Sequence, residues 1–413
     1  MSEHDTDRPT PEIAPGRYGA VSAVSSHPDS RTAAMELADE LYDAVGQGPE
    51  LLMVFVSYHH AAAMSDIVEA LRNAVEPGVC LAVTAESVLG GVQELDDGTG
   101  MSAIAMRMPG VTCSPWFSTP GDRIPLDRAD QIASRIELRD DTRGLIMLAD
   151  PFTTPIAELL PALTACGGLE GIIPVAGGLA SGASQPGHNA LVLNDRVFDA
   201  GAIGVTISGP VDMGFVVSQG CRPIGPLCEV TDAKKNLLLE LDHEPALDRL
   251  RSIAERLPAE DREAIDQGLL IGHALDNDKP YLGRGDFLIR NLFGVEPESN
   301  GLVAAEAMHL GQRVQFHLRD AETATEDLQL LLDAEQMDAM PFGCLLFTCN
   351  GRGRRMFEQP HHDISAVTER LGGVPTAGYF AAGEIGPLGE SGSYVHGQTA
   401  SIALFRRPVK TQQ

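Results

Sequence analysis

Three stretches of the chain repeat one order of hydrophobic and polar positions. The apolar run that opens each copy spans 51–57, 144–150 and 343–349. After a polar or Gly/Pro-containing loop, apolar residues follow at the spacing of an amphipathic helix, as at Met64, Ile67, Val68 and Leu71. A second apolar run then enters a glycine turn. The run that closes each copy spans 100–108, 201–209 and 398–405. The pattern predicts three strand–helix–strand–strand units.

The repeat also predicts how the strands pair. A strand–helix–strand step is a right-handed parallel crossover, and the closing strand is expected to return antiparallel through the glycine loop. We therefore expect an α/β (α+β) protein with mixed β-sheets. Further strands and helices are expected between the second and third copies, at 212–220, 245–266 (helical), 285–293, 302–308, 312–320 and 322–336 (helical). The charged segment 245–266 is the most natural boundary between two domains. The chain is therefore expected to comprise a disordered tail (1–16) and two domains (17–245 and 246–408).

Composition excludes several classes of function. The net charge of −28 opposes binding to nucleic acids and to anionic membrane surfaces. No apolar run approaches the roughly 18 residues of a membrane span, and the polar N-terminus does not resemble a secretory signal. Seven cysteines without a C-x-x-C pair indicate reduced thiols in a cytoplasmic protein. The chain has no Gly-Lys pair and therefore no P-loop.

The loops after the strands of the third copy carry the most chemistry. Ligands favour the carboxyl ends of parallel strands, where glycines let a bound group approach the backbone closely. We expect a polar nest there for a small zwitterion, with Arg352 on a carboxylate, Glu384 on an amine and Asn350 orienting the ligand. The candidate ligand-binding residues are Cys349, Asn350, Gly351, Arg352, Gly353, Gly383, Glu384 and His396.

Other interpretations of these residues remain open. Arg352 and Glu384 could pair with each other as part of the scaffold, and Cys349 with His396 could form a nucleophile and base. Adjacent histidines at 59–60 and 361–362 do not have the spacing of a zinc site, and Asp363 is better explained as a helix N-cap. The glycines of 351–353 lack the third glycine of a dinucleotide fingerprint. No catalytic residue, metal or cofactor is therefore assigned.

Several motifs together resemble those of the FIST proteins, which carry paired FIST N and FIST C domains. They are GCRPIGP (220–226), LDHEPAL (241–247), LLFTCNGRG (345–353), VPTAGYFAAGEIGPLG (374–389) and HGQTASIALF (396–405). The likeness spans roughly 48–240 and 241–390. It implies an intracellular sensory domain for signal transduction that binds a small ligand, with amino acids a common proposal, and no catalytic residue can be transferred.

The resemblance also bears on partners. The two domains take up nearly the whole chain and leave no room for a kinase, cyclase or transcription-factor output, so a signal is expected to pass to a separate downstream protein. We therefore expect a cytoplasmic, non-enzymatic protein with a small-molecule ligand. Two alternatives are a protein-interaction adaptor, since the C domain occurs in some F-box proteins, and a cysteine-dependent transferase or hydrolase.

Overall fold

The computed structural model describes residues 13–14, 16–167, 171–389 and 391–408. It contains the three repeated units, each with a parallel pair of strands, a crossover helix and an antiparallel closing strand. The first unit comprises β2 (Leu51–Ser57), α2 (Met64–Val75), β3 (Val79–Ala85) and β6 (Met101–Arg107). The second comprises β8 (Thr142–Ala149), α4 (Ile156–Ala165), β9 (Val175–Leu179) and β12 (Ala202–Ser208). The third comprises β21 (Gly343–Cys349), α8 (His362–Arg370), β22 (Thr376–Ala381) and β25 (Thr399–Arg406). The expected mixed α/β class is confirmed.

A further strand borders each unit and pairs antiparallel with its closing strand. These strands are β1 (Gly19–Ser25), β7 (Thr112–Ser118) and β13 (Asp212–Gln219). Only β13 was expected from the sequence. Pro115 lies within β7, which is tolerated because β7 is an edge strand and proline has no N–H to give to a further neighbour.

Each unit also contributes a hairpin to the sheet of another unit. The hairpin of β4 (Val88–Gly90) and β5 (Gln93–Leu95) pairs with β22 of the third unit. The hairpin of β10 (Leu191–Leu193) and β11 (Arg196–Phe198) pairs with β3 of the first. The hairpin of β23 (Glu384–Pro387) and β24 (Ser393–His396) pairs with β9 of the second. The three units therefore form a closed ring of exchanged hairpins.

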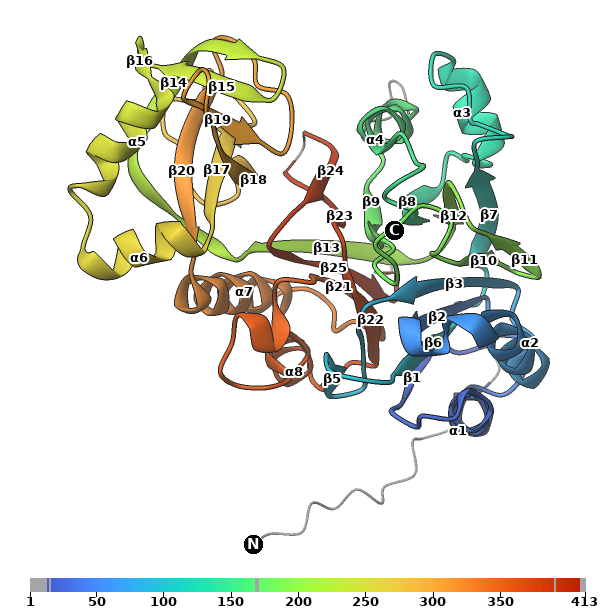
Figure 1. Ribbon diagram of the computed structural model, residues 1–413. Coiled ribbons are helices and arrows are strands. Elements are labelled where there is room, and N and C mark those ends of the chain that lie inside the picture. The colour runs from blue at the N-terminus through green and yellow to red at the C-terminus, as the bar shows by residue number, and fades with distance from the viewer. Residues whose placement is uncertain (1–12, 15, 168–170, 390, 409–413) are drawn as a thin grey trace, which may run out of the picture.

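The three sheets share one apolar interior. Phe55, Phe347 and Tyr379 meet there, with ring centroids 5.4 Å apart for Phe55 and Tyr379 and 5.7 Å apart for Phe347 and Tyr379. Helices cover the outer faces in pairs (Figure 1). The pairs are α1 (Ser30–Val45) with α2, α3 (Ala129–Arg135) with α4, and α7 (Ala321–Glu335) with α8. Because side chains fill the shared interior, a ligand site has to lie where loops leave the sheets.

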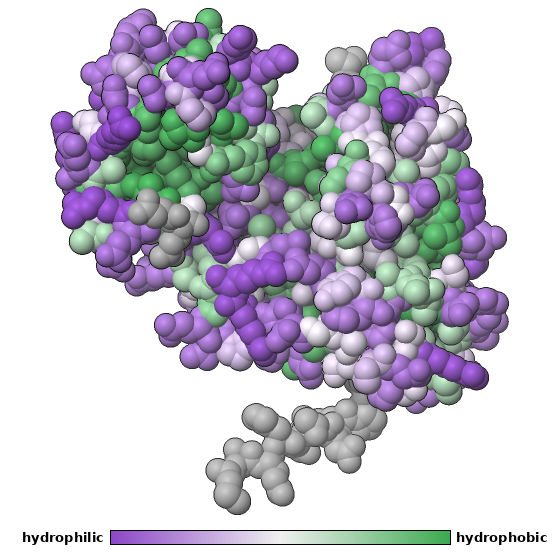
Figure 2. All heavy atoms as spheres, in the orientation of Figure 1, coloured by the Kyte–Doolittle hydropathy of each residue, from purple (hydrophilic) through white to green (hydrophobic). Residues whose placement is uncertain are grey.

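A fourth sheet forms a second lobe, at the upper left of Figure 1. Its strands are β14 (Cys221–Lys234), β15 (Leu237–Leu241), β16 (Glu244–Pro245), β17 (Leu269–Ala274), β18 (Phe287–Glu296), β19 (Gly301–Ala304) and β20 (Arg313–Arg319). They enclose a separate apolar core with α5 (Ala246–Ala254) and α6 (Ala259–Gln267). A hollow separates the two lobes, with hydrophobic side chains exposed along the side of the second lobe (Figure 2).

The expected helix at 245–266 is two helices, α5 and α6. Pro258 immediately precedes α6. Its fixed φ suits the start of a helix, whereas a proline in the interior of a longer helix would interrupt it. Where the chain divides into two domains stays a prediction, and most of the expected tail (1–12 and 15) lies outside the described residues. Within the described ranges, no helix combines the length and apolarity needed to cross a membrane.

Candidate functional site

The loop after β21 turns Arg352 into the protein, where its side chain is fully buried. Its Nε and Nη2 donate to the two carboxylate oxygens of Asp363 at 2.7 and 2.8 Å, and its guanidinium lies over the ring of Phe357. The open alternative in which Arg352 pairs with Glu384 is therefore wrong, because its carboxylate partner is Asp363. Only Nη1 of Arg352 is left without a partner in the described part of the chain. A role for Arg352 in binding a ligand stays a prediction.

Asp363 does not act as the expected N-cap. The helix α8 begins at His362, so Asp363 lies within its first turn and its carboxylate faces Arg352. The N-terminal amides of α8 are instead capped by Glu94 of β5, whose Oε1 accepts from the N–H groups of Asp363 and Ile364 at 2.8 and 3.1 Å. The exchanged hairpin of the first unit thus caps a helix of the third.

Glu384 is buried at the start of β23. Its Oε2 accepts from the amide and the hydroxyl of Thr399, at 3.1 and 2.7 Å, whereas Oε1 has no partner among the described residues. Burial raises the pKa of Glu384 to about 8. The carboxyl group therefore holds its proton at neutral pH, which weakens the case for Glu384 as the anionic partner of a ligand amine.

Cys349 and His396 are both uncharged at neutral pH. Burial and the neighbouring Glu384 raise the pKa of the Cys349 thiol to about 12, while its Sγ accepts from the Gly351 amide at 3.4 Å. Burial lowers the pKa of His396 to about 4. Its Nε2 lies 2.9 Å from the Gly386 carbonyl oxygen, which can only accept, so Nε2 carries the proton. Nε2 is therefore not available as a base for Cys349.

The remaining candidate residues shape the loop and the neighbouring turn. Asn350 and Gly351 offer their carbonyl oxygens to Arg355 and Arg319. Gly353 has a φ of +59°, and a Cβ there would come within 2.8 Å of Asp96 and Phe380. A side chain at 353 would therefore strain the backbone and force Asp96 and Phe380 to shift.

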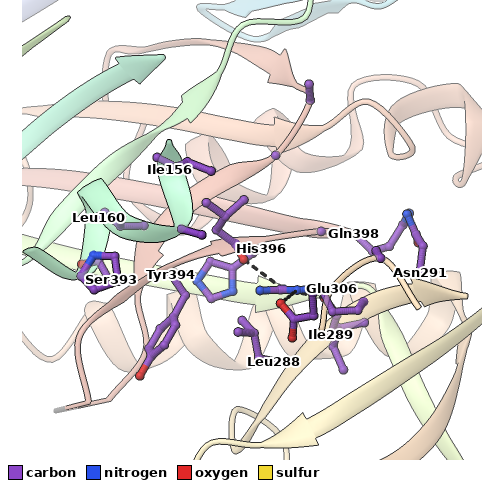
Figure 3. A pocket seen from close by; sticks show the side chains of 18 residues that line it. Ile156, Leu160, Leu288, Ile289, Asn291, Glu306, Ser393, Tyr394, His396 and Gln398 are labelled. Atoms are coloured by element: carbon purple, nitrogen blue, oxygen red, sulfur yellow. Dashed lines mark hydrogen bonds and ion pairs between the residues drawn. The ribbon is translucent and has the colours of Figure 1, made fainter. Parts of the chain in front are cut away.

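Gly383 and His396 line a well-formed cleft, which the other candidates do not reach. Its volume is about 430 Å³, and it lies between β24, the first turn of α4 and strand β18 of the second lobe (Figure 3). Its apolar wall is formed by Ile156, Leu160, Pro161, Leu288, Ile289 and Val395. Its polar side chains are those of Arg290, Asn291, Glu306, Ser393, Tyr394, His396 and Gln398. One wall is thus apolar, while the rest carries charge and amide groups.

A network of charged and polar groups forms one side of the cleft. Glu306 contacts Nε of Arg290 and Nε2 of His273, both at 2.5 Å. Burial opposes ionisation of Glu306, but the hydrogen bond from His273 and the charge of Arg290 outweigh it and lower its pKa. Nη1 of Arg290 donates to the carbonyl oxygens of Ile289 and Val395, so the network joins the two lobes (Figure 3). No described residue accepts a hydrogen bond from Nη2.

Sequence reasoning missed Arg290 and Glu306 because they lie outside the three repeats. The histidine pairs, in turn, have protein partners: Nδ1 of His60 lies 2.8 Å from the Ser30 hydroxyl, and Nδ1 of His361 accepts from the amide of Glu94. Within the described ranges, no three histidine, cysteine or acidic side chains gather as a metal site would require.

Comparisons with known proteins identify the family. Residues 50–244 match the FIST N domain and residues 246–387 match the FIST C domain. Uncharacterized proteins of Mycobacterium tuberculosis (Rv0628c) and Mycobacterium bovis (Mb0898c) are 37% and 36% identical to this chain, over 92% of it and 98% and 97% of their own lengths. A crystal structure of cyanuric acid hydrolase from A. caulinodans aligns with 94% of this chain and 100% of its own, but at 10% identity and a TM-score of 0.35 it supports no inference. The chain belongs to the FIST family, with a FIST N and a FIST C domain in tandem.

Proposed function

We propose that this protein is a non-catalytic, cytoplasmic sensor that binds a small carboxylate with an apolar body in the cleft between its two lobes. An amino acid with an apolar side chain is the simplest molecule of this kind. FIST domains are sensory domains of signalling proteins, which agrees with a binding role. The proposal moves the expected site from the loop at Cys349–Gly353 to the cleft that Gly383 and His396 line.

The observation that carries the proposal is the free Nη2 of Arg290 beside an apolar wall. The other donors of this guanidinium are held by Glu306 and by two backbone carbonyls, which fixes its orientation. Arginine binds carboxylates well because its planar group offers directed N–H donors. A ligand carboxylate on Nη2 would place an aliphatic or aromatic body against Leu160 and Leu288. Mostly apolar clefts with a few oriented polar groups are typical small-molecule sites.

The position of the cleft suggests how binding is communicated. Arg290 and Leu288 belong to β18 of the second lobe, whereas Leu160 and His396 belong to the three-sheet lobe. A ligand that contacts both sides favours the arrangement in which the lobes are closest, and a ligand shifts an equilibrium only by such a preference. A downstream protein would then recognise the favoured arrangement.

The protonation states near the cleft favour binding over catalysis. Cys349 is a thiol rather than a thiolate at neutral pH, because its pKa is raised to about 12. His396 is neutral and its Nε2 proton is engaged, and Glu384 is protonated. Covalent catalysis by cysteine requires a thiolate or an adjacent base. The competing cysteine-dependent enzyme would be supported by rapid alkylation of Cys349 at neutral pH.

The test is a thermal-shift and calorimetric titration with amino acids. Leucine, isoleucine and phenylalanine should stabilise the protein more than aspartate, lysine or glycine. At 100 times its dissociation constant, a ligand should add about 2.7 kcal/mol to the free energy of unfolding. Arg290→Gln should weaken binding at least tenfold, since a charged hydrogen bond contributes about 1.5–3 kcal/mol.

The matched control is Arg284→Gln, which removes an exposed arginine that faces Glu326 outside the cleft. It should leave the affinity unchanged. Equal affinities of the Arg290→Gln variant and the unchanged protein would contradict the proposed site. Equal stabilisation of the protein by amino acids with and without an apolar side chain would also contradict it.

A further inference from the structure

We propose a second ligand site, for a phosphate group, in a notch lined by Arg319 and Arg355 between α6 and the start of α7. The notch has a volume of about 220 Å³, several times the roughly 30 Å³ of a water molecule in the liquid. Its lining residues are Ala264, Gly268, Arg319, Asp320, Ala321, Arg355 and Met356. It shares no lining residue with the cleft at Arg290, so the two proposals are independent.

Arg319 is the main evidence for this site. It is half-buried at the end of β20, and within the described ranges no carboxylate lies within ion-pair distance of it. Its Nη2 donates to the carbonyl oxygen of Gly351, which anchors the guanidinium, and no described residue accepts from its Nε or Nη1. Burial, together with the charges of Arg352 and Arg355, lowers the pKa of Arg319 although Cys349 opposes this. The chain therefore holds a positive charge there without a protein counterion.

The neighbouring carboxylates are already engaged. Asp320 accepts from Nε of Arg222 at 2.8 Å and from the amide of Thr323 at 2.7 Å. Glu86 pairs with Arg355 at 2.5 Å, which leaves that guanidinium 60% exposed at the notch. These carboxylates lie close to the notch, so affinity for an anion has to come from direct contact with Arg319 rather than from a strong local field.

The geometry favours phosphate over smaller anions. Arginine side chains approach the notch from two different elements, the end of β20 and the short helix Gly353–Arg355. A phosphate group has oxygens on several sides and can accept from both guanidinium groups, whereas a carboxylate presents two oxygens in one plane. Inorganic phosphate and a phosphate monoester share this chemistry.

The experiment titrates the full-length protein with inorganic phosphate by calorimetry, with sodium chloride added to keep the ionic strength constant. We expect saturable binding that Arg319→Gln weakens at least tenfold and Arg355→Gln weakens less. The control is Arg354→Gln, which removes the same charge from the same loop at a residue that pairs with Asp96 and does not line the notch. It should retain the affinity for phosphate.

Circular dichroism checks that each variant folds. If Arg319→Gln does not fold, Arg355→Gln, which changes an exposed residue, provides the test. Tighter binding of glycerol phosphate than of inorganic phosphate would identify a monoester as the ligand, and the reverse would identify free phosphate. The proposal is overturned if the unchanged protein shows no saturable binding, if acetate binds as tightly as phosphate, or if Arg354→Gln weakens binding as much as Arg319→Gln.

Discussion

Replacing Asp363 by asparagine should lower the free energy of unfolding by about 3–5 kcal/mol. Asparagine preserves the shape of the side chain but removes its charge, which leaves the guanidinium of Arg352 fully buried without a counterion. The hydroxyl of Thr348 also donates to Asp363, at 2.6 Å, and would keep only a weaker partner. Urea unfolding followed by circular dichroism measures the difference.

Asp333→Asn provides the control for this prediction. Asp333 also pairs with an arginine, Arg370, at 2.5 Å, but its side chain is 51% exposed. Its loss should lower stability by less than about 1 kcal/mol, as is usual for surface ion pairs. Adding Arg352→Met to Asp363→Asn should recover part of the loss because no charge then remains buried. If Asp363→Asn and Asp333→Asn lowered the free energy of unfolding equally, the prediction that the buried pair of Arg352 and Asp363 matters more to stability than a surface ion pair would be wrong.

The second large effect is a fall in stability between about pH 6.5 and 8. Burial raises the pKa of Glu384 to about 8, and burial together with Asp363 raises that of Glu94 to about 8, both from 4.5. In this window the folded state holds protons that the unfolded state has released, so each carboxyl removes about 1.4 kcal/mol of stability per pH unit as the pH rises.

Two histidines offset this effect at lower pH. Burial lowers the pKa of His317 and of His396 from 6.5 to about 4. Between about pH 4.5 and 6.5 the unfolded state binds the extra protons at these two groups, so rising pH stabilises the protein and balances the two carboxyls. Above pH 6.5 only the carboxyls contribute, and the fall should reach about 3 kcal/mol per pH unit.

Urea unfolding at half-unit steps from pH 5 to 8 tests this dependence. Glu384→Gln should halve the slope above pH 6.5, whereas Glu298→Gln, an exposed surface change, should leave it unchanged. A slope in Glu384→Gln equal to that of the unchanged protein would show that Glu384 does not take up a proton on folding.

The repeated part of the fold could be predicted from sequence because its signals are local. The amphipathic spacing of Met64, Ile67, Val68 and Leu71 corresponds to the buried face of α2, and each apolar run became a buried strand. The hairpin exchange could not be predicted in this way. Strands of three or four residues such as β4 carry too little pattern to specify which sheet they join, and that choice depends on contacts distant in sequence.

The candidate site could be predicted only in part. Gly383, which a glycine-rich turn singled out in the sequence, lies at the edge of the cleft, and its role in binding a ligand stays a prediction. The pairing of Arg352 with Asp363 was missed because it depends on where α8 begins, and helix boundaries are the least certain part of a sequence reading. Arg290 and Glu306 were missed because no repeat or motif marks them, and only folding brings β18 beside β24.

The ring of exchanged hairpins also constrains the order of events during synthesis. The strand β4 leaves the ribosome long before β22, with which it pairs, since residues 88–90 precede residues 376–381 by most of the chain. Until then the nascent chain exposes an unpaired hairpin and an incomplete ring, and such edges attract other chains. Premature termination within the third unit should therefore yield aggregates rather than a smaller folded protein.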